Sequence, residues 1–204
     1  MILYGLMDSP FVRRVAVTLC HYGLKYERSA LSVFRDADAL RAVNPLGKAP
    51  ALELDDGELI FDSEMILDHL DAEVGPARAL MPAAGPERRA HQRVVTVALG
   101  LAEKSVALNG ELNRRAAGKI DPDWVARHQV QIASALDWLE ATLAGPWMMG
   151  PDLSQADITT VTSIGHVEHR HSALFDANAV PRLAELAARA ETQAPFNVAP
   201  FSDS

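Results

Sequence analysis

The sequence predicts two domains: an α+β domain in residues 1–77, followed by an all-α helical bundle in residues 86–204. Three observations lead to this fold class. Short apolar runs alternate with a helical pattern in the first part, whereas the second part has helical periodicity only. Between the two parts, Pro76–Pro86 is rich in Ala, Pro and Gly, which is typical of a linker. A chain of 204 residues is also long enough for two small domains.

The N-terminal segment predicts a βαβ unit. Ile2–Tyr4 is a short apolar run typical of a strand, and Phe11–Tyr22 repeats apolar residues at helical spacing. Ser9–Pro10 offers an N-cap and a first helical residue, and Gly23 is suited to end the helix. Tyr26–Leu31 predicts a second strand, which we expect to run parallel to the first.

The next segment predicts a hairpin and a helix. Asn44–Gly47 is typical of a turn, and Ala51–Leu54 and Glu58–Phe61 are short strands on either side of Asp55–Gly57, a hairpin signal. A helix is expected over Ser63–Glu73. The resulting order, βαβ followed by ββα, is that of a thioredoxin-like domain.

The second domain contains no convincing strand. Val94–Leu112 follows the three- and four-residue steps of one long helix. Asp121–Leu143 predicts another helix, and Pro181–Ala190 predicts the last. Ser154–Asp157 has the spacing of a capping box, with Asp in place of the usual Glu. These elements predict a helical bundle.

The composition excludes several classes of protein. Hydrophobic residues make up 49% of the chain and charged residues 23%, as in ordinary globular proteins. A net charge of −8 argues against general nucleic-acid binding, because phosphate contacts need a surplus of Lys and Arg. The single cysteine, Cys20, excludes an internal disulfide and suits a reducing compartment. Neither a secretory signal nor an apolar stretch of roughly 20 residues is present, so we expect a soluble cytoplasmic protein.

Three short segments combine residue types suited to ligand binding. Asn44–Leu52 places Pro50 at the start of a predicted strand, a position where proline is tolerated. Asp62–Ser63 begins one predicted helix and Ser9–Pro10 begins another. Considered separately, each segment has an ordinary explanation. Asn44–Leu52 would be a turn, and Asp62–Ser63 and Ser9–Pro10 would each be a helix cap. A helix N-terminus also exposes N–H groups that attract anions, so capping and ligand binding are compatible.

Together, these segments resemble the glutathione transferase family, in its bacterial, serine-type form. The resemblance extends over nearly the whole chain, although its motifs lie in the first domain. It implies a thioredoxin-like domain that binds glutathione as a co-substrate, a helical domain that shapes the second-substrate pocket, and no metal. The catalytic residue would be Ser9, and the glutathione-binding residues would be Phe11, Lys48, Ala49, Pro50, Asp62 and Ser63.

The resemblance also implies how glutathione is held. A cis peptide bond between Ala49 and Pro50 would present the Ala49 N–H and C=O to the cysteinyl backbone, with Lys48 near the glycyl carboxylate. The N–H and hydroxyl of Ser63 would bind the γ-glutamyl carboxylate, and Asp62 would bind the α-ammonium. The family more often has Glu at this position. Asp62 keeps the negative charge of Glu, but its side chain is shorter and reaches less far. Without the resemblance, Lys48 would be interpreted as a solvated surface lysine.

The implied role of Ser9 is to donate a hydrogen bond to the sulfur of glutathione. A free thiol has a pKa near ~8.5, so it is mostly protonated at neutral pH. One hydrogen bond to a charged group contributes about 1.5–3 kcal/mol, which lowers a pKa by roughly one to two units. The helix N-terminus adds to this effect. Arg13 and Arg14 either add positive potential or are solvated on the helix surface.

Two other groups of residues have ordinary explanations. His166, His169 and His171 resemble a metal-binding cluster, but His171 falls off the helical face of the other two, and no cysteine supports them. We therefore expect scattered surface or cap histidines. Cys20 lies on the far side of its helix from Ser9 and is expected to be a small buried apolar residue.

The leading hypothesis is a glutathione S-transferase that joins the glutathione thiolate to an electrophilic small molecule, a detoxification reaction. A second hypothesis is glutathione-dependent isomerisation or dehalogenation, in which the same thiolate adds and then leaves. A third is a non-catalytic binding or regulatory protein. The presence of all three motifs argues against the third. The identity of the electrophile does not follow from the sequence.

We also expect a homodimer, in which the N-terminal domain of one subunit packs on the helical domain of the other. The family resemblance is one reason. The other is that the helix containing Val94–Leu112 has three apolar residues away from its main stripe, and a helix apolar on two faces usually buries both. These residues are Val95, Leu99 and Val106. The alternative is that the second face packs within the monomer.

Overall fold

The computed structural model describes residues 1–202 and divides the chain into two compact units. The N-terminal unit comprises Met1–Ala83 and residues 191–202, and the helical unit comprises Ala84–Ala190. The fold is therefore the predicted one, an α+β thioredoxin-like unit and an all-helical unit. The expected domain ranges differ at the C-terminus, where residues 191–202 group with the N-terminal unit instead of the helical bundle.

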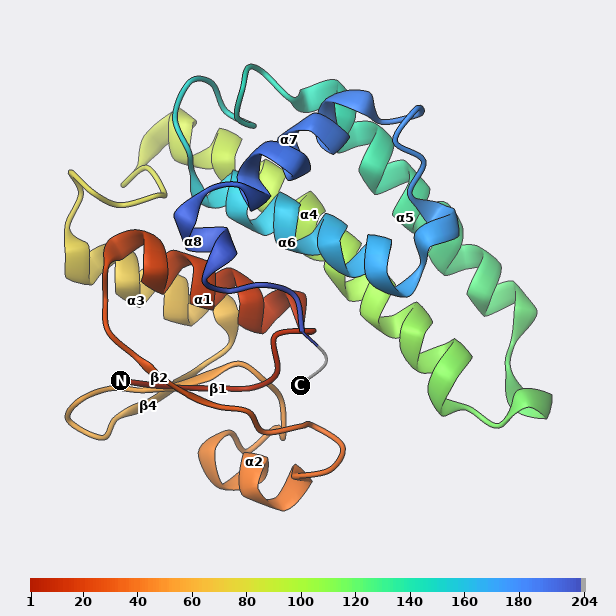
Figure 1. Ribbon diagram of the computed structural model, residues 1–204, viewed down its shortest axis with the longest axis horizontal. Helices are drawn as coiled ribbons and strands as arrows, with labels where there is room; N and C mark the ends of the chain where they lie inside the picture. Colours follow the sequence, from red (N-terminus) through yellow and green to blue (C-terminus); the bar gives the residue numbers. More distant parts are fainter. Residues whose placement is uncertain (203–204) are drawn as a thin grey trace. The chain divides into compact units, whose positions relative to one another are not determined.

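The N-terminal unit is built on a four-stranded sheet (Figure 1). Its strands lie in the order β2-β1-β3-β4, and β1 pairs with β2 in parallel and with β3 antiparallel, while β3 and β4 form the predicted hairpin. This confirms the βαβ unit expected from the N-terminal segment. The strands are β1 (Ile2–Tyr4), β2 (Glu27–Ser29), β3 (Ala51–Glu53) and β4 (Leu59–Phe61).

Helices cover both faces of this sheet. In Figure 1, α1 (Pro10–Tyr22) and α3 (Ser63–Val74) lie on one face, and α2 (Ala37–Val43) lies on the other. Helix α1 ends at Gly23 in the left-handed conformation with φ 69°, which glycine adopts without steric cost. The buried core combines residues of the sheet with residues of these helices, chiefly Leu3, Leu52, Ile60, Val15, Leu19, Leu40, Ile66 and Leu70.

Two short helices were not predicted. The seven residues of α2 bury only Leu40, so they contain no apolar periodicity to recognise. The four-residue helix α8 (Ala194–Asn197) packs against α1 and buries Phe196. Such short segments depend on tertiary contacts for their stability, because nucleation of an isolated helix is unfavourable.

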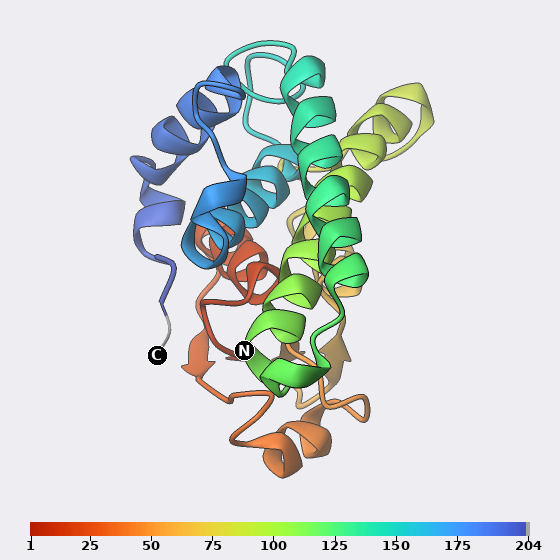
Figure 2. The same ribbon diagram turned by 90° about the vertical axis from the view of Figure 1, so that its right-hand side faces the viewer.

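The helical unit is organised around two long helices. Helix α4 packs against both α5 and α6, and Figure 2 shows α4 and α5 side by side. None of the helices in the described part of the chain combines the length and the hydropathy needed to span a membrane. The elements are α4 (Gly85–Arg114), the 3₁₀ turn η1 (Ala117–Lys119), α5 (Pro122–Thr142), α6 (Gln155–Arg170), the 3₁₀ turn η2 (Ser172–Leu174) and α7 (Pro181–Glu191).

Helix α6 begins with the predicted capping box, which is buried. The Asp157 carboxylate is fully buried and accepts hydrogen bonds from the Ser154 N–H at 2.8 Å, from the Ser154 hydroxyl at 2.7 Å, and from the Met148 N–H. It therefore fixes both the start of α6 and the loop that precedes it. Every residue from Gln155 to Val167 is buried, so α6 is the most enclosed helix of the unit.

Candidate functional site

The three candidate segments emerge at the same edge of the N-terminal sheet. Tyr4 at the end of β1 pairs with Ala51 at the start of β3, and Ala51 pairs with Phe61 at the end of β4. The loop after β1, the loop before β3 and the start of α3 therefore lie beside one another. These segments contain Ser9, Lys48 to Pro50, and Asp62 with Ser63.

Ser9 is the N-cap of α1, as predicted. Its Oγ accepts a hydrogen bond from the Val12 N–H at 3.4 Å, and Pro10 is the first residue of the helix. Because capping uses a lone pair of the hydroxyl, the hydroxyl proton remains free to be donated to another group. Ser9 is half-buried, so its hydroxyl combines a fixed position with access to solvent. The cap and a hydrogen bond to a ligand can therefore coexist.

The loop before β3 presents an unpaired peptide group. The Ala49–Pro50 bond is cis, as predicted. Ala49 is half-buried, and no other group among residues 1–202 forms a hydrogen bond with its N–H or its C=O. Such a backbone can pair with an extended ligand, as an edge strand pairs with a peptide. Lys48 is exposed beside it, where its ammonium can reach an anionic group.

Asn44 and Gly5, which were not predicted as site residues, hold this loop in place. Asn44 is buried; its Nδ2 donates to the Lys48 carbonyl at 2.8 Å, and its Oδ1 accepts from the Leu46 N–H at 3.0 Å. Gly5 has φ +130°, and a Cβ there would lie 2.8 Å from the Cβ of Ala49. The loop after β1 thus touches the loop before β3, and a larger residue at position 5 would clash. The turn residues around Asn44 are a signal that can be seen in the sequence. The contact of Gly5 with Ala49 depends on the tertiary fold and therefore leaves no signal in the sequence.

The start of α3 combines a carboxylate with a buried hydroxyl. Asp62 has φ 68°, the only positive value among the described non-glycine residues, and its Oδ1 accepts from the Glu64 N–H at 3.0 Å. Ser63 is buried, and its Oγ accepts a hydrogen bond from Nη1 of Arg14 at 3.4 Å. Unusual backbone conformations of this kind gather at functional sites. The helix N-terminus, Ser63 and Arg14 together favour a carboxylate, and exposed Asp62 favours a cation.

Arg13 and Arg14 are not solvated surface residues, contrary to one of the two expectations. Both are only 2% exposed. Arg13 donates from Nε to the Ala199 carbonyl at 2.8 Å and from Nη2 to both oxygens of Glu191, at 2.7 and 2.8 Å. It therefore anchors the C-terminal segment to α1, which explains why residues 191–202 group with the N-terminal unit.

Two further residues of α1, Phe11 and Cys20, lie near opposite ends of the helix. Phe11 is half-buried in the first turn of the helix, at the same end as Ser9. Cys20 is half-buried near the opposite end, and its Sγ lies 3.8 Å from the Tyr26 hydroxyl. Burial raises the pKa of the Cys20 thiol, although the Tyr26 hydroxyl opposes this effect. A raised pKa makes a thiol less reactive at neutral pH.

Of the three clustered histidines, His166 and His171 are buried, so the expectation of scattered surface or cap residues is wrong for His166. Its Nδ1 lies 2.7 Å from the Ser105 hydroxyl, and Nε2 of His171, the C-cap of α6, lies 2.9 Å from the Ser105 carbonyl. Nδ1 of His169 lies 2.7 Å from the Gly165 carbonyl. Each ring is thus engaged with α4 or α6, and residues 1–202 contain no group of three metal-binding side chains.

This cluster predicts a loss of stability in acid. Burial, with smaller contributions from His171, Arg170 and His169, lowers the pKa of His166 to about 3. Between that value and ~6.5, the unfolded chain binds a proton that the native chain excludes. The free energy of unfolding should therefore fall by about 2 kcal/mol between pH 6.5 and pH 5 through His166 alone. Urea unfolding at both pH values measures this. The His166→Gln variant should lose less free energy of unfolding on acidification than the wild-type protein. An equal loss in both proteins would contradict the assignment of this pH dependence to His166.

Comparison with known proteins gives the same architecture. Residues 3–78 match the family model of the glutathione S-transferase N-terminal domain, and residues 122–189 match that of the C-terminal domain. Similar curated proteins include the GST-like protein YibF of Escherichia coli, 27% identical over 171 residues and 84% of each chain. Maleylacetoacetate isomerase of Pseudomonas aeruginosa is 29% identical over 195 residues, 91% of this chain and 90% of the enzyme.

Solved structures extend the similarity to the whole chain. A glutathione transferase family member from Pseudomonas fluorescens Pf-5 with bound glutathione has 31% identity, covers 98% of both chains and gives a TM-score of 0.87. A glutathione S-transferase from Methylobacterium radiotolerans in complex with glutathione sulfonate has 26% identity, covers 100% of this chain and 96% of its own, and gives a TM-score of 0.92. The fold and the site define a two-domain protein with a thioredoxin-like first domain. The chain belongs to the glutathione S-transferase family.

Proposed function

We propose that this protein is a glutathione S-transferase that joins the glutathione thiolate to electrophilic small molecules. The observation that supports this most strongly is that Ser9, the unpaired Ala49 backbone and Ser63 meet at one sheet edge. The Pseudomonas fluorescens relative described above has glutathione bound. The single cysteine suits the reducing cytoplasm, where glutathione is abundant as a thiol.

Each part of glutathione has a matching group at this edge. The Ala49 N–H and C=O would pair with the cysteinyl backbone, and exposed Lys48 would attract the glycyl carboxylate. At the other end, Ser63 and the first turn of α3 would bind the γ-glutamyl carboxylate, and Asp62 the α-ammonium. Phe11 and Pro50 would contribute apolar walls.

Ser9 would activate the sulfur. Its Oγ–H is available because the capping bond to Val12 uses only a lone pair. A hydrogen bond from this hydroxyl stabilises the thiolate relative to the thiol by about 1.5–3 kcal/mol. The thiolate, not the thiol, is the nucleophile. It attacks the electrophilic carbon while the leaving group departs with its electron pair, or it adds to an activated alkene, which takes up the electrons and then a proton from water.

Glutathione-dependent isomerisation is the second candidate, and the similarity to maleylacetoacetate isomerase over 195 residues favours it. In that reaction the thiolate adds to one carbon of a cis alkene conjugated to a carbonyl. The carbon–carbon bond then rotates, and the thiolate leaves as the trans alkene forms. The same hydroxyl at Ser9 serves both reactions, because both begin from the thiolate.

The test begins with retention on immobilised glutathione and elution by free glutathione. A panel of aryl halides, epoxides and cis enones is then assayed. Conjugation consumes one glutathione for each product, whereas isomerisation consumes none. Retention without any turnover would favour the binding-protein hypothesis, and a failure to be retained together with no turnover would contradict the proposal.

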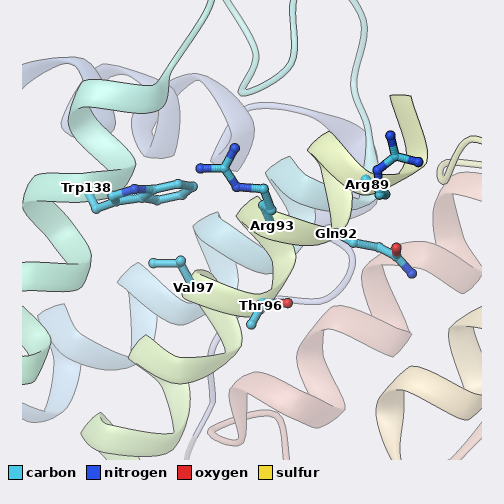
Figure 3. Close-up of a pocket in the computed structure, with 6 residues that line it drawn as sticks. All are labelled: Arg89, Gln92, Arg93, Thr96, Val97 and Trp138. Atoms are coloured by element: carbon cyan, nitrogen blue, oxygen red, sulfur yellow. The ribbon is translucent and has the colours of Figure 1, made fainter. Parts of the chain in front are cut away.

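We also propose that the protein acts as a homodimer. The helical unit has a hollow of about 590 Å³ between α4 and α5, lined by Arg89, Gln92, Arg93, Thr96, Val97 and Trp138 (Figure 3). The Arg93 guanidinium carbon lies 5.8 Å from the centre of the Trp138 ring. Arg89 and Arg93 form no ion pair with any described residue. This surface is therefore cationic in a chain of net charge −8.

A complementary surface exists on the N-terminal unit. The exposed residues of α3 include Glu64, Met65 and Glu73, so this helix offers carboxylates and an apolar side chain. Contact of α3 with the hollow of a second copy would be repeated twice by a two-fold axis. The predicted second apolar face of α4 supports the dimer less than expected. Of its three residues, Val95 is buried, Leu99 is half-buried and Val106 is exposed.

Light scattering at micromolar concentration should therefore give about twice the 22.1 kDa of one chain. Reversing both charges with Arg89→Glu and Arg93→Glu should shift the mass to that of the monomer, because like charges across an interface repel. The matched control is Lys25→Glu with Lys119→Glu, which changes the charge equally at exposed sites outside the hollow. A monomeric wild-type protein would refute the dimer, and equal behaviour of the two double variants would exclude this interface.

A further inference from the structure

The two neighbouring arginines of α1 differ in how their buried charge is compensated. Arg13 uses both Nε and Nη2 in hydrogen bonds to Ala199 and Glu191. Arg14 is equally buried, but its side chain forms one hydrogen bond, from Nη1 to the Ser63 Oγ at 3.4 Å. Nε of Arg14 is buried without a partner among the described residues. A buried charge left so incompletely compensated requires an explanation.

The surroundings of Arg14 keep it charged. Burial lowers its pKa to about 10, and the carboxylates of Glu64 and Asp62 partly oppose this effect. The guanidinium is therefore still positive at neutral pH, directly beneath the first turn of α3. Its charge adds to the positive end of the helix dipole, which already favours an anion at this point.

The hydrogen bond to Ser63 has a direction that matters for ligand binding. A guanidinium can only donate, so the Ser63 oxygen is the acceptor in this bond. The hydroxyl proton of Ser63 must then point elsewhere, and it is available to an anion at the start of α3. Without Arg14 the hydroxyl could rotate and lose this preference.

We propose that Arg14 is a positioning residue that acts through Ser63 to prepare the start of α3 for a carboxylate. This rests on the proposed function, in which that carboxylate belongs to the γ-glutamyl group of glutathione. Arg14 does not touch the sulfur or the electrophile. It supplies a positive charge close to the first turn of α3, and it orients the Ser63 hydroxyl toward the carboxylate of the ligand.

The test compares two thiols, glutathione and cysteinylglycine, which lacks the γ-glutamyl group. Arg14→Gln should raise the KM for glutathione about tenfold, the loss expected for one hydrogen bond to a charged group, and should leave kcat at saturating glutathione within about twofold. The KM for cysteinylglycine should not change. Arg14→Lys keeps the charge but not the guanidinium, so it should raise the KM for glutathione by less than Arg14→Gln does. If the glutamine protein does not fold, this smaller rise in KM for glutathione, with no change for cysteinylglycine, is the test.

A double-mutant cycle with Ser63→Ala separates positioning from a general structural effect. In the Ser63→Ala background, Arg14→Gln should cost less affinity than in the wild-type background, because the part of its effect that passes through that hydroxyl is already lost and only the effect of the charge remains. The matched control is Arg13→Gln, which should lower stability without changing the preference for glutathione over cysteinylglycine. Equal losses for both thiols, or full additivity in the cycle, would overturn the inference. Wild-type protein that fails to bind glutathione would instead contradict the proposed function.

Discussion

Ser9→Ala is expected to lower turnover by roughly 10- to 100-fold while leaving glutathione affinity nearly unchanged. The physical reason is that the hydroxyl donates to the thiolate and contributes little to holding the rest of glutathione. The pKa of the bound thiol should rise by about one to two units, back toward that of a free thiol. Steady-state kinetics and the thiolate absorbance of bound glutathione as a function of pH measure the two effects.

The same substitution removes a helix cap, so a control must separate the two roles. Ser9→Thr retains both the cap and the hydroxyl, and it should keep most of the activity. Asp121→Ala removes the N-cap of α5, whose carboxylate accepts from the N–H groups of Asp123 and Trp124. It should cost about 1 kcal/mol of stability, as cap removal usually does, without changing the thiol pKa. If Ser9→Ala behaves like Asp121→Ala, Ser9 is only a cap.

Asp157→Ala is expected to destabilise the protein by about 3–5 kcal/mol, since two buried N–H groups would be left without acceptors at about 1–3 kcal/mol each and the start of α6 would lose its cap. The two N–H groups belong to Met148 and Ser154. Asp157→Asn keeps an acceptor oxygen and should destabilise the protein less than Asp157→Ala does. Urea unfolding followed by circular dichroism measures the change.

Asp176→Ala is the matched control for this prediction. Asp176 is exposed, and its carboxylate accepts from the Asn178 N–H at 2.9 Å, so water can replace the lost acceptor. Its loss should cost no more than about 0.5 kcal/mol, as is usual at the surface. Similar losses for Asp157→Ala and Asp176→Ala would mean that the buried box does not hold α6 in place.

The parts of the fold that could be predicted depend on local signals. Ser9–Pro10 and Asp121–Pro122 start helices through bonds to N–H groups only two or three residues away, and Gly57 closes the hairpin with φ 89°. Helices α2 and α8 are short and gain their stability from packing, so no periodicity reveals them. The grouping of residues 191–202 depends on a contact between Arg13 and Glu191, 178 residues apart.

In the candidate site, too, the residues found in short motifs could be predicted from the sequence, and those that depend on tertiary contacts could not. The cis bond before Pro50, and the choice of the adjacent residues Asp62 and Ser63 as ligand-binding residues, followed from a resemblance to a known family that is carried by short motifs. Sheet register explains why those motifs meet at one edge, since each follows or precedes a paired strand end. Asn44 and Arg14 could not be assigned from sequence, because their importance lies in hydrogen bonds that burial makes necessary.

The most direct test of the glutathione site is a titration of isotope-labelled protein with glutathione, followed by amide chemical shifts in NMR spectra. The amides of Ala49 and Ser63 should shift saturably and with one dissociation constant, together with those around Ser9. Amides at the far end of α1, near Cys20, should change little. Absence of saturable shifts at Ala49 and Ser63, or saturable shifts confined to the helical unit, would contradict the proposal that this sheet edge binds glutathione.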